Sequence, residues 1–449
     1  MAHLDFVLER FAAHADAEAI IWHDETYRYG WLLEQVEHWK ARLQSAAVDA
    51  GSVVALEADF SPHAVAAFLA LVDAGFILVP LSPAVQSKRD EFLEIAEVEV
   101  RAALDAHDHA TLTRLPTAAT HEHYQELRAR RHPGLVLFSS GSTGKSKAAV
   151  HDMVGILEKF TQRRHTRRTM AFLMFDHIGG INTMLYTLSN GGCMVTTADR
   201  SPDGVLRAVE RYHVELLPTS PTFLNLVLLS EAYKRYDLRA LQLITYGTEP
   251  MPEGTLARIH ALLPGIELLQ TYGLSEVGIL RSKSRSSDSL WVKVGGEGFQ
   301  TRIVDGILQI QSRSAMLGYL NAPSPFTDDG WFVTGDAVEQ DGEYVRIRGR
   351  LSEIINVGGE KVHPAEVESA IQGIENIAGV LVYKESNPIT GNMVCAQVSL
   401  IHDEDPKAVA RRVKQHCREQ LRPFQVPVKV NVVQAISHSE RFKKQRLIR

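Results

Sequence analysis

Residues 51–83, GSVVALEADFSPHAVAAFLALVDAGFILVPLSP, decide the fold of this chain. The stretch begins with a short apolar run, Val53 to Leu56, of the kind that forms a buried strand. Ser61-Pro62 then supplies an N-cap and a first-turn proline, the helix continues through Ala64 to Val72, and Gly75 ends it. Phe76 to Leu81 is a second apolar strand. Strand, helix and strand in this order predict a parallel sheet covered on both faces.

Further apolar strands of the same kind occur along the first two thirds of the chain, at Leu135–Phe138, Leu216–Leu217 and Leu243–Thr245. From Trp291 onward the pattern changes to short alternating runs separated by Gly and Asp. These runs predict antiparallel strands joined by Asp-Gly hairpin turns, at Arg302–Val304, Ile307–Gln311, Trp331–Val333 and Tyr344–Ile347. After Arg350 a further α+β unit of about 100 residues is large enough to fold separately.

Composition excludes several classes of protein. The chain has 449 residues and a formal net charge of −6, so it lacks the general basic surface on which duplex nucleic-acid binding depends. Its three cysteines, Cys193, Cys395 and Cys417, form neither a disulfide framework nor a metal-ligand spacing, which favours a reducing, cytoplasmic location. Residues 1–11 lack the apolar core of a secretion signal. The longest apolar stretch, residues 64–81, is interrupted by Asp73, Gly75 and Pro80, so no membrane span is expected.

The strongest local motif is Ser-Ser-Gly-Ser-Thr-Gly-Lys-Ser-Lys at 139–147, directly after the strand Leu135–Phe138. Glycines and small hydroxyl residues let backbone N–H groups converge on a phosphate, and lysine adds positive charge. The P-loop of NTPases requires a glycine separated by four residues from the Gly-Lys-Ser triplet, and Ser139 stands there instead. A flexible linker has no reason to follow a buried strand. The motif therefore predicts a nucleotide phosphate site outside the P-loop class.

This loop resembles the phosphate loop of the adenylate-forming superfamily, which contains acyl-CoA and aryl-CoA ligases, peptide-synthetase adenylation domains and beetle luciferases. The family pattern has proline before the second lysine and glycine after it, where this chain has Ser146 and Ala148. Lys147 then takes the place of the family lysine. The resemblance implies that the loop holds the phosphates of ATP through Ser139, Ser140, Gly141, Ser142, Thr143, Gly144 and Lys147.

Four further segments occur in the family order. Thr271-Tyr272-Gly273-Leu274-Ser275-Glu276 resembles the element in which tyrosine packs on adenine, the hydroxyl residue contacts phosphate and glutamate holds Mg²⁺. A carboxylate is the hard oxygen ligand that Mg²⁺ prefers beside phosphates. Gly247-Thr248-Glu249-Pro250 resembles the segment that lines adenine and the acyl group. Thr334-Gly335-Asp336 resembles the segment whose aspartate accepts the ribose hydroxyls.

The fourth segment and the C-terminus resemble the family's mobile domain. Arg350 would contact ribose, Ser352 occupies the hinge position where aspartate or lysine is typical, and Gly358-Gly359 would line the thiol tunnel. At the end of the chain, Lys443 has the spacing of the family's adenylation lysine, although Phe442 replaces the preceding glycine. The resemblance implies an α/β fold. A large N-terminal domain of parallel and mixed sheets with flanking helices and a small β-barrel-like part would span residues 1–351, and a smaller mobile α+β domain residues 352–449.

The same resemblance implies a two-step reaction. A carboxylic acid attacks the α-phosphate of ATP with Glu276, Thr143, Lys147 and Lys443 as the catalytic residues, and a thiol then takes the acyl group from the adenylate. The implied cofactors are ATP and Mg²⁺, with CoA or a phosphopantetheine thiol as co-substrate. A loading enzyme for a carrier protein is the second interpretation. The third is a degenerate nucleotide-binding member, for which Ser146, Ala148, Ser352 and Phe442 are the supporting departures.

The acid pocket can be aligned in two registers around Phe175-Asp176-His177. Amino-acid adenylation domains place an ammonium-binding aspartate here, whereas acyl-CoA ligases and luciferases place a histidine followed by x-x-Gly. His177 keeps the ungapped distance of the acyl type and is preferred as a pocket wall; the alternative is Asp176. Other expected pocket residues are Met174, Ser220, Pro221, Tyr246, Gly247, Leu274, Val277 and Gly278. This set contains no fixed cation, so a neutral aryl or aliphatic tail is expected.

Overall fold

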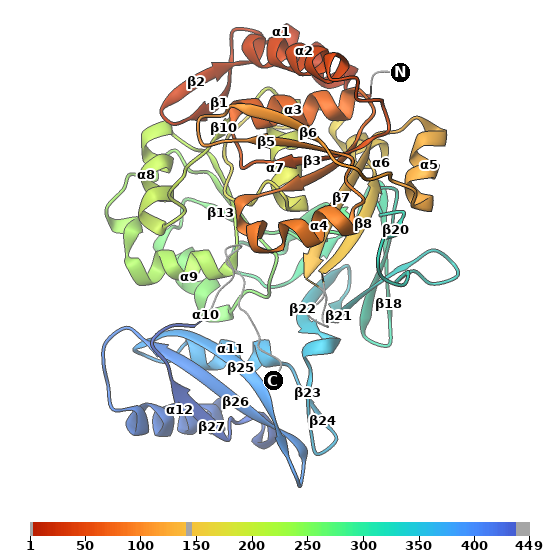
Figure 1. Cartoon of the computed structure of the whole chain (residues 1–449). Helices are drawn as coiled ribbons and strands as arrows, with labels where there is room; N and C mark the ends of the chain where they lie inside the picture. Colours follow the sequence, from red (N-terminus) through yellow and green to blue (C-terminus); the bar gives the residue numbers. More distant parts are fainter. Residues whose placement is uncertain (1–2, 141–145, 437–449) are drawn as a thin grey trace.

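The computed structural model describes residues 3–140 and 146–436 of the chain (Figure 1). These residues form a large N-terminal part, built on three sheets, and a small C-terminal part below it, coloured blue in Figure 1. The predicted α/β class with a smaller C-terminal unit is confirmed. The predicted Lys443 and the loop residues Gly141, Ser142, Thr143 and Gly144 lie outside the described residues.

The first seven-stranded sheet is the one that residues 51–83 predict. Its strand order is β20-β8-β7-β4-β3-β5-β6, with β3, β4, β5 and β7 parallel and the outer pairs antiparallel. The strands are β3 (Val53–Glu57), β4 (Ile77–Leu81), β5 (Val100–Leu104), β6 (Ala110–Arg114), β7 (Gly134–Ser140), β8 (Ser146–Asp152) and β20 (Gly318–Tyr319). The helices α4 (Arg89–Ile95) and α5 (Glu122–Arg130) accompany it.

A second seven-stranded sheet has the order β13-β12-β11-β9-β10-β1-β2 and is parallel except at the β1–β2 edge. Its strands are β1 (Glu18–Trp22), β2 (Glu25–Arg28), β9 (Arg168–Met170), β10 (Cys193–Val195), β11 (Leu216–Thr219), β12 (Leu243–Tyr246) and β13 (Glu267–Gln270). The helices α8 (Pro202–Tyr212), α9 (Pro221–Ser230) and α10 (Glu253–Leu262) connect its strands.

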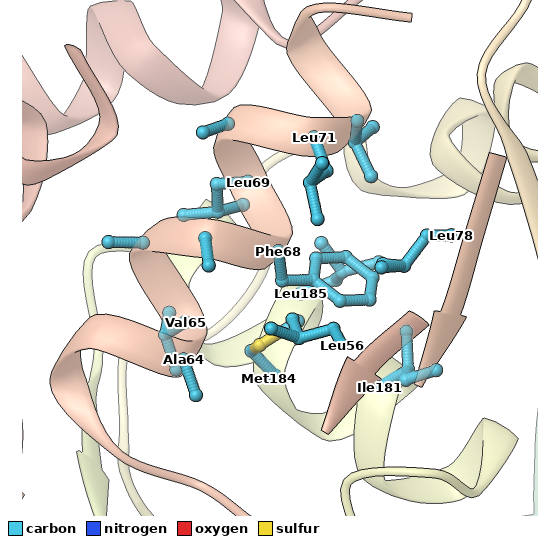
Figure 2. Close-up of a cluster of buried hydrophobic side chains, with 14 of the residues drawn as sticks. Leu56, Ala64, Val65, Phe68, Leu69, Leu71, Leu78, Ile181, Met184 and Leu185 are labelled. Atoms are coloured by element: carbon cyan, nitrogen blue, oxygen red, sulfur yellow. The ribbon is translucent and has the colours of Figure 1, made fainter. Parts of the chain in front are cut away.

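The core between these sheets is built around α3 (Pro62–Asp73) and α7 (Ile178–Ser189). Ser61 caps α3 by accepting a hydrogen bond from the backbone N–H of Ala64, as expected for an N-cap serine before proline. Phe68 points from α3 toward Leu56 and Leu78 of the first sheet, and Leu185 of α7 meets the same cluster (Figure 2). The helices α1 (Asp5–Ala13) and α2 (Tyr29–Ser45) cover its outer side (Figure 1).

The third sheet is antiparallel and has six strands in the order β16-β17-β22-β21-β19-β18. They are β16 (Ser282–Ser284), β17 (Val292–Val294), β18 (Phe299–Val304), β19 (Ile307–Ser312), β21 (Phe332–Asp341) and β22 (Tyr344–Arg350). Both Asp-Gly turns join the strands expected. The strand order has two ends, β16 and β18, at the place where the resemblance implies a small β-barrel-like part. A two-stranded hairpin, β14 (Gly273–Leu274) and β15 (Gly278–Ile279), links the third sheet to the second sheet.

The C-terminal part begins beyond the short helix η4 (Leu351–Glu353). It contains a hairpin, a three-stranded sheet in the order β25-β26-β27, and two helices. These are β23 (Ile355–Val357), β24 (Glu360–Val362), α11 (Pro364–Gln372), β25 (Ile377–Asn387), β26 (Gly391–Leu400), α12 (Pro406–Gln420) and β27 (Lys429–Val432). Its own core of Val, Ile, Ala and Cys side chains is separate from those of the large part, as expected for an independent folding unit.

The core arrangement leads to a first prediction about stability. Leu69→Ala in α3 removes a completely buried side chain and should lower the free energy of unfolding by about 2–5 kcal/mol. Leu262→Ala is the matched control because Leu262, at the end of α10, is 42% exposed. It should cost less than about 1 kcal/mol. Urea unfolding followed by circular dichroism measures both, and equal losses would contradict the assigned core.

Candidate active site

Predicted site residues follow the carboxyl ends of parallel strands in both large sheets. Ser139 lies at the end of β7, Ser220 follows β11, Gly247 follows β12 and Tyr272 follows β13. In open α/β sheets ligands bind at this edge of the strands. The ends of β11, β12 and β13 are joined by backbone hydrogen bonds, from Gly247 N to the Thr219 carbonyl at 3.3 Å and from Thr271 N to the Tyr246 carbonyl at 2.8 Å.

Position 247 requires glycine because there is no space for a side chain. A Cβ at Gly247 would lie 2.7 Å from Thr271 Oγ1 and 2.8 Å from the Thr271 carbonyl oxygen. A side chain would therefore separate two strand ends that must meet. The next residue, Thr248, has a φ of 74°, an unusual conformation for a β-branched residue. Strain of this kind is maintained where surrounding contacts over-determine the backbone, which is common at ligand sites.

The ends of the predicted phosphate loop are held in a β-hairpin. β7 and β8 pair antiparallel as far as Ser139 with Lys147 and Ser140 with Ser146. On the outer side, Asn321 accepts from Ala148 N at 3.0 Å and donates to the Ser146 carbonyl at 2.9 Å. Lys88 Nζ lies 3.2 Å from Ser146 Oγ, so the hydroxyl that replaces the family proline has a partner. The loop therefore leaves from and returns to a rigid pair of strands.

Glu276 lies where the first and third sheets meet the β14–β15 hairpin. Its Oε1 accepts hydrogen bonds from Tyr319 Oη at 2.8 Å and, more weakly, from Ser139 Oγ at 3.4 Å. Lys147 Nζ lies 5.1 Å from the centroid of the Tyr319 ring, a cation–π contact. Burial and the Glu276 carboxylate raise the pKa of Tyr319 well above its usual value, which keeps the phenol protonated as a donor.

The structure thus brings together three predicted residues, Ser139, Lys147 and Glu276, and adds Tyr319 to them. Tyr319 belongs to β20, whose two residues pair with Val150 and Ala149 of β8. No local pattern in the sequence marks this tyrosine, because its role depends on the pairing of β20 with β8. A search for tyrosines in edge strands could have raised it as a candidate, but could not have assigned its partner.

The expected ribose site is a group of three side chains, in which Tyr272 and Asp336 are buried and Arg350 is half exposed. Tyr272 Oη donates to Asp336 Oδ2 at 2.5 Å, and Arg350 Nε lies 3.4 Å from Asp336 Oδ1. Burial raises the pKa of Asp336, while Arg350 and the Tyr272 hydroxyl oppose the shift. Burial alone would lower the pKa of Arg350, but Asp336 and Glu276 outweigh it, and the net shift is upward. Thr334 Oγ1 accepts from Asp336 N at 2.9 Å and fixes the carboxylate's backbone.

Glu249 and Ser220 lie together at the start of α9. Glu249 Oε1 accepts from Thr222 N at 2.7 Å, and Ser220 Oγ accepts from Phe223 N at 3.2 Å. Both side chains satisfy backbone N–H groups in the first turn of the helix. Glu249 therefore has a capping contact besides its expected position near the adenine.

His177 is the N-cap of α7. Its Nδ1 accepts from Gly179 N at 3.0 Å, which places the ring proton of the neutral side chain on Nε2. Asp176, the residue of the alternative register, is buried with an exposure of 4%. Gly180 is packed against the Met174 carbonyl, 2.0 Å from where a Cβ would lie, so the turn before α7 is tightly closed. These contacts do not distinguish the two alignments of the acid pocket. His177 and Asp176 therefore both remain predicted pocket residues.

Other expected pocket residues lie in the β14–β15 hairpin and at the end of β12. Leu274 and Gly278 face each other across the β14–β15 hairpin. A Cβ at Gly273 would lie 2.7 Å from the Gly278 carbonyl oxygen, so this hairpin also requires glycine. Tyr246 is 1% exposed, and its hydroxyl has no hydrogen-bond partner within residues 3–140 and 146–436. Burial raises the pKa of this hydroxyl and keeps it protonated.

A cation that the sequence analysis missed lies beside the hairpin. Lys159, in the short helix η2 (Glu158–Phe160), donates from Nζ to the Ile279 carbonyl at 3.0 Å. Burial, with a further contribution from Arg281, lowers its pKa from 10.5 to about 7. No pattern in the sequence marks this lysine, because a lysine near a helix end is usually solvated.

The predicted hinge and thiol-tunnel residues lie in the C-terminal part. Ser352 is exposed in η4, and Gly358-Gly359 form the turn of the β23–β24 hairpin. Gly358 N donates to the Thr390 carbonyl at 2.9 Å, so this turn rests on the tip of the β25–β26 hairpin. The turn points away from the large part in Figure 1. Arg348 pairs with Glu366 of α11 and connects the two parts beside Arg350.

The donor set of the site fits magnesium bound mainly through phosphate oxygens. Within the described residues, no group of three or more His, Cys, Asp or Glu side chains gathers as a protein-only metal cage. Mg²⁺ at nucleotide sites is usually held by one or two carboxylates together with phosphates and water. Glu276 could supply such a carboxylate, with its Oε1 already held by Tyr319. In the part of the chain covered by the structure, no helix is long and apolar enough to cross a membrane.

The strand ends, the hairpin that holds the predicted phosphate loop and the Tyr272, Asp336 and Arg350 group are arranged as expected for an adenylate-forming enzyme. The family model for AMP-binding enzymes matches residues 8–305, and that for the AMP-binding enzyme C-terminal domain matches residues 366–443. The chain belongs to the AMP-binding enzyme family.

Curated relatives are CoA ligases. The chain is 27% identical over 368 residues to 3-[(3aS,4S,7aS)-7a-methyl-1,5-dioxo-octahydro-1H-inden-4-yl]propanoyl:CoA ligase of Rhodococcus jostii (strain RHA1), covering 77% of this chain and 67% of the relative. It is 28% identical to indoleacetate–CoA ligase of Aromatoleum aromaticum, with 59% and 57% covered. The 2-succinylbenzoate–CoA ligase of Enterococcus faecalis is 23% identical, with 92% and 91% covered. The chain thus spans between 57% and 91% of these relatives' lengths.

Solved structures share the fold. The anthranilate CoA ligase AuaEII in complex with anthranoyl-AMP has a TM-score of 0.84 at 18% identity, covering 99% of this chain and 95% of the other. ATP-bound MatB from Rhodopseudomonas palustris has a TM-score of 0.80 at 21% identity, covering 99% and 97%. The predicted family and fold are therefore confirmed.

The position of Lys159 leads to a prediction about pH. The pKa of Lys159 is about 7 in the folded protein and 10.5 in the unfolded chain, so the unfolded chain binds more protons between these pH values. The buried ammonium lowers the free energy of unfolding at pH 7, and this free energy rises again as the pH increases toward 10.5. Lys159→Met should therefore stabilise the protein at pH 7, by roughly 1–3 kcal/mol. The gain should shrink toward pH 10.

Urea unfolding of wild type and variant at pH 7, 8.5 and 10 measures this difference. Lys384→Met, at an exposed lysine of β25, is the matched control and should show no such pH dependence. A gain from Lys159→Met that is the same at all three pH values would show that the ammonium is not desolvated in the folded protein.

Proposed function

We propose that this protein is an AMP-forming acid–thiol ligase: it activates a carboxylic acid with ATP and transfers the acyl group to CoA. In the first step an oxygen of the acid forms a bond to the α-phosphorus, the bond to the bridging oxygen breaks, and pyrophosphate leaves. In the second step a thiol sulfur forms a bond to the acyl carbon, the thiol proton is lost, and AMP leaves. Membership of the AMP-binding enzyme family and the CoA-ligase relatives support the proposal.

The observation that carries it is the arrangement around Glu276. A carboxylate and a phosphate repel each other, so the site must supply positive charge and donors at the place where they meet. Lys147 and Ser139 lie at the ends of the phosphate loop, and Tyr319 connects Lys147 to Glu276. A magnesium ion bound by Glu276 would supply the remaining positive charge at the phosphates.

The nucleotide would be held on the opposite side by the Tyr272, Asp336 and Arg350 group. Asp336 uses one oxygen for Tyr272 and the other faces Arg350, so a ribose hydroxyl would join or replace these contacts. Because Asp336 and Arg350 belong to neighbouring strands of the third sheet, β21 and β22, the group would keep the nucleotide in place through both steps. Gly247, Thr248 and Glu249 would line the adenine between this group and the acid pocket, with Gly273 and Ser275 on the neighbouring hairpin.

The two steps require different groups at the same place. We assign residues 1–351 to the adenylation domain, residues 352–449 to a mobile domain, and the hinge to Ser352. Lys443 would neutralise charge in the first step, and the Gly358-Gly359 turn would replace it in the second. Gly358-Gly359 rests on the β25–β26 tip, so the C-terminal part can carry this turn as one unit.

Pyrophosphate exchange tests the first step. Wild type should exchange labelled pyrophosphate into ATP only when a suitable acid and Mg²⁺ are present. Lys443→Ala should reduce this exchange by about 100-fold or more, because it removes charge that acts in the transition state. Lys444→Ala, the neighbouring lysine, should retain it. If Lys444→Ala abolishes exchange and Lys443→Ala does not, the assignment of the two lysines is wrong.

The second step distinguishes the remaining interpretations. Wild type should form an acyl-CoA from acid, ATP and CoA, and Lys443→Ala should still form it from preformed acyl-adenylate. Thioester formation on a phosphopantetheinyl carrier protein, with none on CoA, would favour the loading enzyme. An absence of exchange with every acid of a broad panel would favour the degenerate nucleotide-binding interpretation.

A further inference from the structure

Lys159 occupies an unusual position for a lysine in this fold. It follows β8 and α6 (Met153–Leu157), and the helix η2 turns its side chain inward to the Ile279 carbonyl, 3.0 Å from Nζ. Phe160, the next residue, is 4% exposed and belongs to the core around α3 and α7. The Lys159 ammonium also lies 5.1 Å from the centroid of the Phe160 ring. The charged end of this side chain therefore lies at the edge of the apolar core, with Arg281 as a nearby charged group.

The Ile279 carbonyl that Lys159 contacts belongs to the β14–β15 hairpin, whose turn contains Glu276. Ile279 pairs with Gly273 across β14 and β15, and its neighbour Gly278 pairs with Leu274. The Ile279 side chain packs against the core that contains Ile178, the first residue of α7. Because His177 is the N-cap of α7, Lys159 lies at the junction of the two elements that supply the expected wall of the acid pocket.

The charge of Lys159 is not neutralised by the described chain. Within residues 3–140 and 146–436, Nζ makes one hydrogen bond, to the Ile279 carbonyl, and no ion pair. An ammonium has three N–H donors, so two are available to another group. The nearby Arg281 adds positive charge and is paired with Glu297 at 3.1 Å. An unpaired cation in apolar surroundings costs stability unless an anion meets it.

We propose that Lys159 is a specificity-determining residue that receives a second carboxylate, at the end of the acid remote from the reacting carboxyl group. The inference rests on the proposed function and narrows its substrate to dicarboxylic acids. The two oxygens of this carboxylate would each accept from one of the two available ammonium donors at the rear of the pocket, while the reacting carboxylate faces the phosphate loop. Charge-assisted hydrogen bonds of this kind are strong where water is excluded.

The competing explanation is structural. Lys159 could serve only to satisfy the Ile279 carbonyl and hold β15 against α7. In that case its removal would impair every acid in the same proportion, because the hairpin would move for all of them. A selective effect on dicarboxylic acids is what a purely structural lysine would not produce.

Matched acid pairs separate the two explanations. Initial rates of acid-dependent pyrophosphate exchange give kcat/KM for benzoate against terephthalate and for hexanoate against adipate. Wild type should prefer one of the dicarboxylic acids to its monocarboxylic partner. Lys159→Met should lower kcat/KM for that dicarboxylic acid by about tenfold or more and leave the monocarboxylic partner within about twofold. Lys159→Arg should retain much of the preference, and Lys384→Met should behave as wild type.

Binding gives a readout that does not depend on turnover. Non-hydrolysable acyl-sulfamoyl adenosines made from the two members of the preferred pair should bind wild type with different affinities, and Lys159→Met should remove that difference in calorimetry. Equal losses for both analogues would overturn the inference. Exchange with monocarboxylic acids but with neither dicarboxylic acid would overturn it and leave the proposed function intact. Exchange with no acid would overturn both.

Discussion

The hydrogen bond between Tyr319 and Glu276 marks the junction on which the site depends. The segment that contains Tyr319 runs between sheets. Leu317 N donates to the Val150 carbonyl of β8 at 2.7 Å, while Met316 N donates to the Glu276 carbonyl at 2.7 Å. One segment therefore fixes the phosphate-loop hairpin and the glutamate relative to each other. The loop follows β7 of the first sheet, whereas Glu276 lies in the β14–β15 hairpin. Without the connecting segment, no shared stretch of chain would set the distance between them.

The junction also explains why several buried polar groups are tolerated here. Asp336, Tyr272, Tyr319 and Glu276 lie in or near the core of the third sheet, where unpaired polar atoms would cost free energy. Each has a hydrogen-bond partner from a different segment of the chain. Such a network is stable only when all its segments are in place. The site is consequently assembled by the complete large part rather than by any single motif.

Much of this arrangement could be predicted from the sequence. Residues 51–83 determine a strand, a helix and a strand whose order leaves only a parallel sheet, and the Asp-Gly turns determine the hairpins of the third sheet. The motifs at 139–147 and 271–276 identified Lys147 and Glu276 because their spacing is local. Tyr319 and Lys159 were not found, because each acts through a residue distant in sequence and neither lies in a recognisable pattern. The expectation of an acid pocket without a cation did not include Lys159, because its burial depends on the packing of α7 against β15.

In the proposed reaction, an oxygen of the organic acid attacks the α-phosphate of ATP. Oxygen-18 labelling of the acid tests it most directly, by mass spectrometry of the AMP formed after complete transfer to CoA. Attack at the α-phosphate predicts AMP that carries one labelled oxygen from the carboxylate, together with unlabelled pyrophosphate. Unlabelled AMP, or the formation of ADP and labelled phosphate, would contradict the account.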